Sequence, residues 1–247
     1  MGGAEQFLTD GEFLRSLRNT VIFSLGKLAL QFPMAIMLAL ALNELQHARI
    51  KKIYQTVFTF PHFISWVVMA GILKNMFASN GVINQLLTVW GMESVSPLLS
   101  LTGFRPFIWF SNIWKEAGWD TIIYMAALAG IDPGLYEAAE IDGANRWRKI
   151  WHITLPGIRS TILIMLILEI GRIMTTGASF DQVFNLYSSP VYEVADTIDT
   201  YIYRTSFGGT KNFGYTTAVG LSKSVIGVLM MLGANRLVTA CGEDGLF

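Results

Sequence analysis

Reactive and metal-binding side chains are scarce in this sequence of 247 residues, which holds one cysteine and three histidines. The single cysteine, Cys241, excludes a disulfide framework and a cysteine-rich metal site. The histidines, His47, His62 and His152, are scattered along the chain, and none belongs to a His-Glu-x-x-His pattern that would place two ligands on one helix face. We therefore predict no metal site.

Motifs for nucleotide binding and for hydrolysis are also missing. The sequence has no Gly-x-x-x-x-Gly-Lys-Ser/Thr loop, so we do not expect the chain itself to bind ATP phosphates. It has no Gly-x-Ser-x-Gly elbow for a serine nucleophile, and we predict no catalytic residues. Charged residues make up only 15% of the chain, with 18 basic and 18 acidic side chains, which excludes a nucleic-acid-binding protein and a disordered chain.

Apolar residues, in contrast, make up 52% of the chain and come in long blocks. A helix rises about 1.5 Å per residue, so about 20 apolar residues cross the roughly 30 Å hydrocarbon core of a bilayer. The fold predicted from this pattern is an all-α, polytopic transmembrane helical bundle that forms a single domain over residues 1–247. Its five predicted spans are residues 20–42, 57–76 (broken near Pro61), 104–128, 157–176 and 215–238.

The distribution of basic residues indicates how these spans are oriented. Met1 is not followed by a basic stretch and an apolar core, so we expect no cleavable signal peptide and insertion directed by the first span. If segment 130–156 is cytoplasmic, basic residues are denser inside than outside, as the positive-inside tendency requires. We therefore predict an outer amino terminus and an inner carboxyl terminus.

Segment 130–156 is the longest polar interval between two apolar blocks. Asp132 can cap a helix that Pro133 begins, and Gly143 can end it, which predicts a helix over 133–141. A second helical run is predicted over 144–153, ending near Leu155-Pro156. The first helix carries a small, mostly apolar surface that a partner could receive in a groove, made of Leu135, Tyr136, Ala138 and Ala139.

The spacing of three short motifs in this segment resembles the EAA loop of ABC importer permeases. These motifs are Glu137-Ala138-Ala139, then Asp142-Gly143-Ala144, and then Leu155-Pro156. An ordinary helical hairpin with a well-capped turn is the alternative. Within the permease family the chain is most similar to the carbohydrate-uptake group that includes the maltose permeases, and in it to the oligosaccharide or polysaccharide branch. The resemblance implies a type I ABC importer permease (MetI-like) core with five visible spans, coupled to an ATPase through Glu137, Ala138, Ala139, Asp142, Gly143, Leu155 and Pro156.

The resemblance also implies partners and a location. It implies a bacterial cytoplasmic (inner) membrane, an ABC ATPase dimer that binds ATP and Mg, a second and related permease subunit, and an extracellular solute-binding protein that delivers a sugar. No cofactor is expected in this chain. Relatives commonly have one further span before the counterpart of the first, so either the start is truncated or this is a five-span variant surrounded by membrane lipid.

Polar residues inside the predicted spans are candidates for the sugar pathway, because they are costly against lipid and must face a partner, a cavity or an interface. A stripe on the third span contains Asn112, Lys115, Glu116 and Trp119, and the resemblance places sugar-contacting residues on this face. On the fourth span, Glu169 and Arg172 lie one turn apart and can form an ion pair. Lys223 on the fifth span and Lys27 on the first complete the set. The alternatives are purely structural pairing for these groups and, for Lys27 and Lys223, contact with lipid headgroups.

The predicted intramembrane charges have an excess of positive charge, with four basic residues against two acidic ones: Lys27, Lys115, Arg172 and Lys223 against Glu116 and Glu169. We therefore predict a pathway that favours neutral or acidic sugar chains and disfavours cationic ones. Segment 177–212 is rich in aromatic residues, which fits either a membrane interface or contact with the solute-binding protein.

Three other functions stay open. They are a membrane-embedded enzyme that uses Glu116 or Glu169 as acid or base, a passive channel or scaffold, and an ABC exporter.

Overall fold

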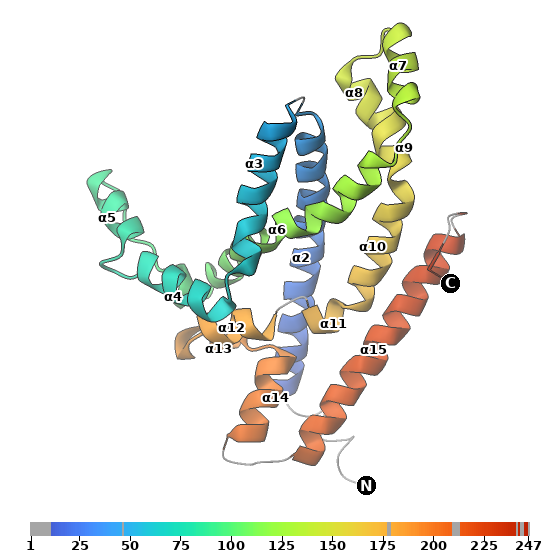
Figure 1. Ribbon diagram of the computed structural model, residues 1–247. Helices are drawn as coiled ribbons and strands as arrows, with labels where there is room; N and C mark the ends of the chain where they lie inside the picture. Colours follow the sequence, from blue (N-terminus) through green and yellow to red (C-terminus); the bar gives the residue numbers. More distant parts are fainter. Residues whose placement is uncertain are drawn as a thin grey trace. The chain divides into compact units, whose positions relative to one another are not determined.

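The computed structural model describes residues 11–45, 47–176, 179–208, 213–240, 242 and 245–246 (Figure 1). Within these ranges the regular structure is helical and no strand occurs, which confirms the all-α prediction. The three longest helices are α2 (Gly11–Asn43), α6 (Phe104–Ala129) and α15 (Phe213–Ala240). The other elements are α3 (Ala48–Thr59), η1 (Phe60–Phe63), α4 (Trp66–Met76), α5 (Val82–Val89), η2 (Pro97–Leu99), α7 (Pro133–Ile141), α8 (Arg146–Lys149), η3 (Ile150–Thr154), α9 (Leu155–Gly157), α10 (Arg159–Gly171), α11 (Ile173–Thr176), α12 (Phe180–Leu186), η4 (Ser189–Val191), α13 (Tyr192–Ala195) and α14 (Ile198–Phe207).

The chain divides into two compact units. The first unit comprises the described residues of Met1–Leu28, Ile64–Asn112 and Arg172–Val228. The second unit comprises those of Ala29–Phe63, Ile113–Gly171 and Leu229–Phe247. Each of the three longest helices therefore contributes residues to both units.

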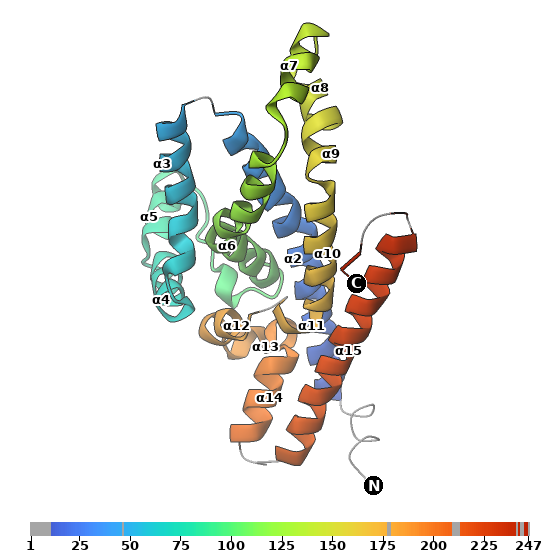
Figure 2. The same ribbon diagram turned by 45° about the vertical axis from the view of Figure 1, so that its right-hand side comes forward.

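The first unit is built around the amphipathic helix α4. Ser65 caps this helix by accepting a hydrogen bond from the Val68 amide at 3.3 Å. Trp66, Met69, Ala70 and Leu73 recur at helical spacing and are buried, and α12 packs against α4 (Figure 2). The same core contains Phe23, Phe104, Ile108, Val183 and Leu186.

A buried polar network closes the first unit at the start of α2 and α6. The Asn19 amide donates to the carbonyl oxygens of Glu193 and Asp196 at 3.0 and 2.9 Å, and Arg105 donates to Asn19 at 2.7 Å. Asp196 is 1% exposed and forms an ion pair with Arg204 at 2.7 Å. The pairing matters because an unpaired charge buried at this site would destabilise the fold.

The second unit is built on close contacts among α2, α6 and α10. Ala35 and Ala39 lie one turn apart on α2 and are buried in one cluster with Tyr124, Leu128 and Ile158. Small side chains at this spacing let two helices approach closely, as they do in membrane bundles. The Thr121 hydroxyl donates to the Ala35 carbonyl at 3.2 Å, a contact that the close approach makes possible.

Gly118 allows α3 to cross α6 in the second unit. A Cβ atom at this glycine would lie 2.1 Å from the Phe58 carbonyl oxygen, so a side chain would collide with backbone. The Thr59 hydroxyl donates to the Gly118 carbonyl at 3.3 Å. This crossing fixes the position of η1, which follows α3 directly, over the Lys115–Trp119 face of α6.

The observed helix boundaries differ from the predicted spans at two breaks. The second predicted span, 57–76, is divided among α3, η1 and α4, and its break lies at residues 64–65 and not at Pro61. Pro61 sits inside the short helix η1, whereas Ser65 adopts an extended conformation to cap α4. The fourth predicted span, 157–176, is interrupted at Arg172, between α10 and α11.

Two helices in the described part of the chain, α2 and α15, are long and apolar enough to cross a membrane. Two interrupted pairs, Ala48–Phe63 with Trp66–Met76 and Arg146–Gly157 with Arg159–Gly171, raise the number to four if each pair is one span. The 26-residue helix α6 matches the predicted bounds, but every 18-residue window in it contains Lys115, Glu116 and Asp120. That α6 crosses the membrane stays a prediction.

Candidate functional site

The predicted helix over 133–141 is confirmed as α7, the first half of the candidate coupling segment. The Asp132 carboxylate accepts a hydrogen bond from the Gly134 amide at 2.9 Å, which caps the helix. At its other end Gly143 has a φ of +72°, in the left-handed region that favours glycine. The Gly143 amide donates to the Glu140 carbonyl at 3.0 Å, which completes the end of the helix.

The second half of the segment does not end at Leu155-Pro156 as predicted. It runs through α8, a single π-helical turn at η3, and α9, which continues to Gly157. Pro156 lies inside this continuous helical run, directly after the π-helical turn, and its missing N–H removes one helical hydrogen bond there. After Gly157 the chain bends by 60° into α10.

Two side-chain contacts join α7 to the returning helices. The Tyr136 and Thr154 hydroxyls are hydrogen-bonded at 3.1 Å. The Lys149 ammonium contacts the Glu140 carboxylate at 2.5 Å, and this hydrogen bond and its charge lower the pKa of Glu140 below its ordinary value. At the base, a Cβ on Gly157 would lie 2.8 Å from the Ile131 side chain, so the two ends of the segment are held close together. Both views show α7 and α8 side by side at the end of this hairpin (Figures 1 and 2).

The exposed surface of the hairpin is more apolar than predicted. Leu135 and Ala138 are exposed on α7, whereas Tyr136 is partly buried by its contact with Thr154. The most exposed apolar side chains are ones the motif-based prediction omits: Ile141 at 89%, Trp147 at 71% and Trp151 at 64%. The sequence signal that could have identified them is the presence of tryptophans in a segment otherwise rich in charge. Exposed apolar groups of this size mark a surface for a partner.

A cavity of about 480 Å³ lies beside the hairpin, between α2 and the α8–η3 helix. Its wall is largely apolar, with one acidic and one basic side chain. The lining residues are Met37, Leu40, Ala41, Glu44, Arg146, Trp147 and Ile150.

Of the predicted pathway stripe, Lys115, Glu116 and Trp119 lie together in the second unit. Lys115 is 5% exposed, and its ammonium donates to Glu116 Oε1 at 3.0 Å. The structure adds His62, from η1. Its Nδ1 lies 2.6 Å from Glu116 Oε2, and its ring stacks on Trp119 with centroids 4.2 Å apart and planes within 5°. We call Lys115, Glu116 and Trp119 the α6 cluster, and His62 lies over it.

The remaining predicted pathway residues do not join the α6 cluster. Asn112 is 6% exposed and belongs to the first unit, on the same helix α6. Glu169 lies in the second unit and Arg172 in the first, so the ion pair between them stays a prediction. Lys223, on α15, forms an ion pair with Asp199 of α14 within the first unit.

Two carboxylates that the predicted set omits, Asp120 and Asp199, also have side-chain partners in the structure. Asp120 accepts a hydrogen bond from Gln31, and Asp199 pairs with Lys223. Asp120 lies on α6 beside the predicted stripe, whereas Asp199 lies on α14, outside the predicted spans. These contacts do not test the predicted preference for neutral or acidic sugar chains, which stays a prediction.

The aromatic residues of segment 177–212 form a connected row in the first unit. Phe184 lies 5.0 Å from Phe180 and 4.8 Å from Tyr203, measured between ring centroids. Tyr187 and Tyr192 are 4.9 Å apart and extend the row. The contacts leave both predicted roles open, the membrane interface and the solute-binding protein.

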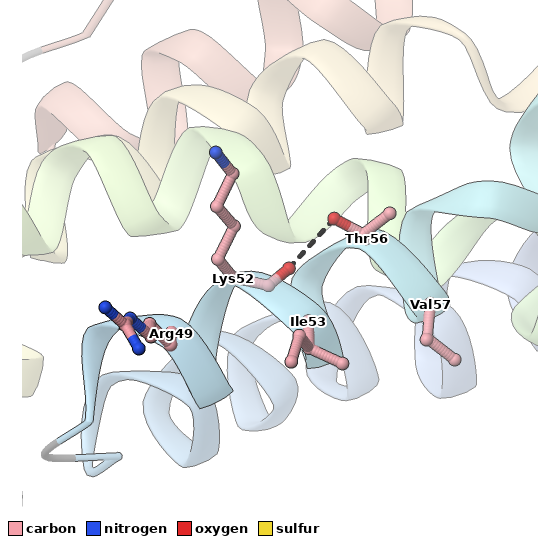
Figure 3. A pocket seen from close by; sticks show the side chains of 5 residues that line it. All are labelled: Arg49, Lys52, Ile53, Thr56 and Val57. Carbon is pink, nitrogen blue, oxygen red and sulfur yellow. Dashed lines mark hydrogen bonds between the residues drawn. The ribbon is translucent and has the colours of Figure 1, made fainter.

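A second cavity of about 480 Å³ lies along α3, and all five residues that line it belong to this helix (Figure 3). In the close-up, Lys52 and Thr56 point to one side, Ile53 and Val57 point to the other, and Arg49 lies at one end. Because one helix supplies the whole lining, this cavity is an open surface rather than an enclosed site.

The sequence of the chain is similar to those of known permeases over most of its length. It is 42% identical to the polygalacturonan/rhamnogalacturonan transport system permease protein YteP of Bacillus subtilis (strain 168), over 98% of this chain and 75% of the relative. It is 30% identical to the lactose transport system permease protein LacF of Rhizobium radiobacter, over 88% of this chain and 73% of the relative. These similarities confirm the predicted resemblance to sugar permeases of ABC importers.

The fold is similar to that of solved transporters. One is a bacterial alginate ABC transporter in complex with an alginate pentasaccharide-bound periplasmic protein, with a TM-score of 0.94 and 38% identity over 100% of this chain and 85% of that chain. Another is a bacterial ABC transporter involved in the import of the acidic polysaccharide alginate, with a TM-score of 0.91 and 40% identity over 97% of this chain and 84% of that chain. The family model for the binding-protein-dependent transport system inner membrane component matches residues 31–240. The chain therefore belongs to this family, the membrane-embedded permease subunits of ABC importers, which are transport subunits and not enzymes.

Proposed function

We propose that this permease subunit imports acidic oligosaccharides, of the uronate-rich kind found in pectin and alginate. The observation that carries the proposal is the pattern of identity among relatives. The relatives named for the transport of polygalacturonan/rhamnogalacturonan and of alginate, polymers that contain uronates, are 38% to 42% identical over nearly the whole chain, whereas the lactose permease is 30% identical. The substrate assignment thus follows the more similar group.

The hairpin 130–156 supplies the mechanical part of this function. Its exposed apolar tip is a surface for a separate ATPase dimer, which would bind ATP and Mg, because the chain contains no phosphate-binding loop of its own. The segment returns directly into α10, and its base touches Ile131 just after α6. Docking of the ATPase would therefore act on two helices that carry predicted pathway residues, and alternate the exposure of the pathway.

The α6 cluster supplies a contact for the sugar. Trp119 keeps 43% of its surface exposed although His62 stacks on its ring, so indole surface is left for a sugar ring to pack against. Glu116 is engaged by Lys115 and His62, which argues against the alternative in which it acts as a free catalytic acid or base.

The experiment is reconstitution of the full complex, with the second permease, the ATPase and the solute-binding protein, in proteoliposomes. We expect ATP-dependent uptake of trigalacturonate and weak uptake of maltotriose, a neutral sugar of the same length. A complex with a hydrolysis-deficient ATPase is the control and should take up neither. Uptake of maltotriose with equal or higher efficiency would contradict the assignment of acidic substrates.

A further inference from the structure

His62 is held over the α6 cluster by backbone contacts that do not involve its own side chain. The Phe58–Thr59 backbone of α3 lies against Gly118, and the Thr59 hydroxyl donates to the Gly118 carbonyl at 3.3 Å. His62 follows three residues later in η1 and is 29% exposed by side chain. The position of the imidazole is therefore set by the crossing of two helices.

The contacts of His62 engage the whole α6 cluster. The Lys115 ammonium donates to the His62 carbonyl at 2.7 Å, and the imidazole Nδ1 faces Glu116 Oε2 at 2.6 Å. Since a carboxylate only accepts hydrogen bonds, Nδ1–H is the donor. Lys115 contacts the other oxygen, Oε1, so each oxygen of Glu116 has one donor.

This arrangement is informative about the charge of the substrate. Glu116 is 19% exposed by side chain and lies next to Trp119, the ring we expect to contact the sugar. An uncovered carboxylate at this position would repel a uronate, because like charges interact strongly where water is partly excluded. Two donors on its two oxygens reduce that repulsion.

We propose that His62 is a positioning residue that covers the Glu116 carboxylate and orients Trp119, and that it thereby makes the pathway tolerant of acidic sugars. The inference rests on the proposed function, since it explains how acidic substrates pass the Glu116 carboxylate on α6. His62 acts through Glu116 and Trp119 and is not assigned a contact with the sugar.

Two substitutions separate the two contacts of the imidazole. His62→Phe keeps a ring against Trp119 and removes the donor to Glu116, whereas His62→Asn keeps a donor near the Nδ1 position and removes the ring. In the reconstituted complex we expect His62→Phe to raise the KM for trigalacturonate about tenfold, the scale of one hydrogen bond to a charged group, and to leave the KM for maltotriose unchanged. His62→Asn should keep the charge preference and raise the KM for both sugars by a similar factor.

A double variant that also removes the charge of Glu116 tests whether His62 acts by covering that charge. Glu116→Gln in the His62→Phe background should restore the KM for trigalacturonate to within about twofold of the wild type, because no carboxylate remains to be covered. His47→Asn, at an exposed histidine ahead of α3, is the matched control and should change neither KM. Assembly of each complex is checked by size-exclusion chromatography.

The outcomes distinguish the inference from the function it rests on. If His62→Phe affects both sugars alike, or if Glu116→Gln does not restore trigalacturonate uptake, His62 has only a structural role and the inference is overturned. If the wild-type complex itself prefers maltotriose, the proposed function fails instead.

Discussion

Individual glycines set the close contacts on which the second unit depends. At Gly118 the nearest atoms to an added Cβ are all backbone, at 2.1 Å from the Phe58 oxygen and 2.8 Å from the Thr59 nitrogen. Backbone cannot rotate away as the end of a flexible side chain can. The crossing of α3 and α6, and with it the position of His62, therefore requires glycine at 118.

We predict that Gly118→Ala destabilises the assembled complex by about 1–3 kcal/mol, the usual cost of overpacking. The measurement is the thermal unfolding midpoint of the purified complex, which should fall. Gly233→Ala, in α15, is the matched control, since nothing lies within 4 Å of an added Cβ there and alanine favours helix. Equal midpoints for the two variants would show that α3 does not cross α6 as described.

Contacts between residues that lie far apart in the sequence were the least predictable part of the site. The stripe on α6 was predictable because its members share one helix face. His62 was not, because it lies 54 residues before Glu116 and its local sequence shows only a proline and three aromatic neighbours. The pairing of Lys223 with Asp199 likewise depends on the packing of α14 against α15, which no local sequence pattern predicts.

At the scale of elements, the hairpin 130–156 is defined by its helix ends. The capping of α7 by Asp132 and its left-handed end at Gly143 are local features, so the sequence predicted both correctly. The passage of the returning helix through Pro156 was missed, because the π-helical turn η3 has no simple sequence signature. The break at 64–65 was misplaced for a similar reason, since Pro61 is the stronger local signal and yet fits inside η1.

We predict that Gly143→Val weakens the association of the permease with its ATPase. A β-branched residue at φ +72° costs about 1–2 kcal/mol or more, which should unwind the end of α7. The measurement is the amount of ATPase retained in a pull-down with the complex at limiting concentration, and a loss of about tenfold is expected.

Gly143→Asn is the matched control for this loss, because asparagine tolerates the left-handed conformation and should retain most of the binding. Nothing lies within 4 Å of an added Cβ at Gly143, so the comparison tests conformation and not crowding. Equal retention of the ATPase by the valine and asparagine variants would argue against α7 as the docking helix.

At the scale of the whole molecule, the orientation of the chain in the membrane decides whether the hairpin can meet an ATPase. Arg148 lies in α8 near the tip of the hairpin and is exposed, so it is suited to labelling. We predict that Arg148→Cys, combined with Cys241→Ser, reacts with a membrane-impermeant maleimide in inside-out vesicles and not in intact cells. Labelling in intact cells would place the hairpin outside and end the importer assignment.

Gly157 and Ile131 give the hairpin a stiff base. Because the two ends of the segment touch where they join the chain after α6 and before α10, a load on the tip cannot be absorbed by spreading of the hairpin. We expect such a load to tilt α6 and α10 together, so that a small rotation at the base produces a larger lateral shift at Lys115 and Trp119, several helical turns away on α6. By the same geometry, a sugar that binds between α6 and α10 and separates them would rotate the tip of the hairpin.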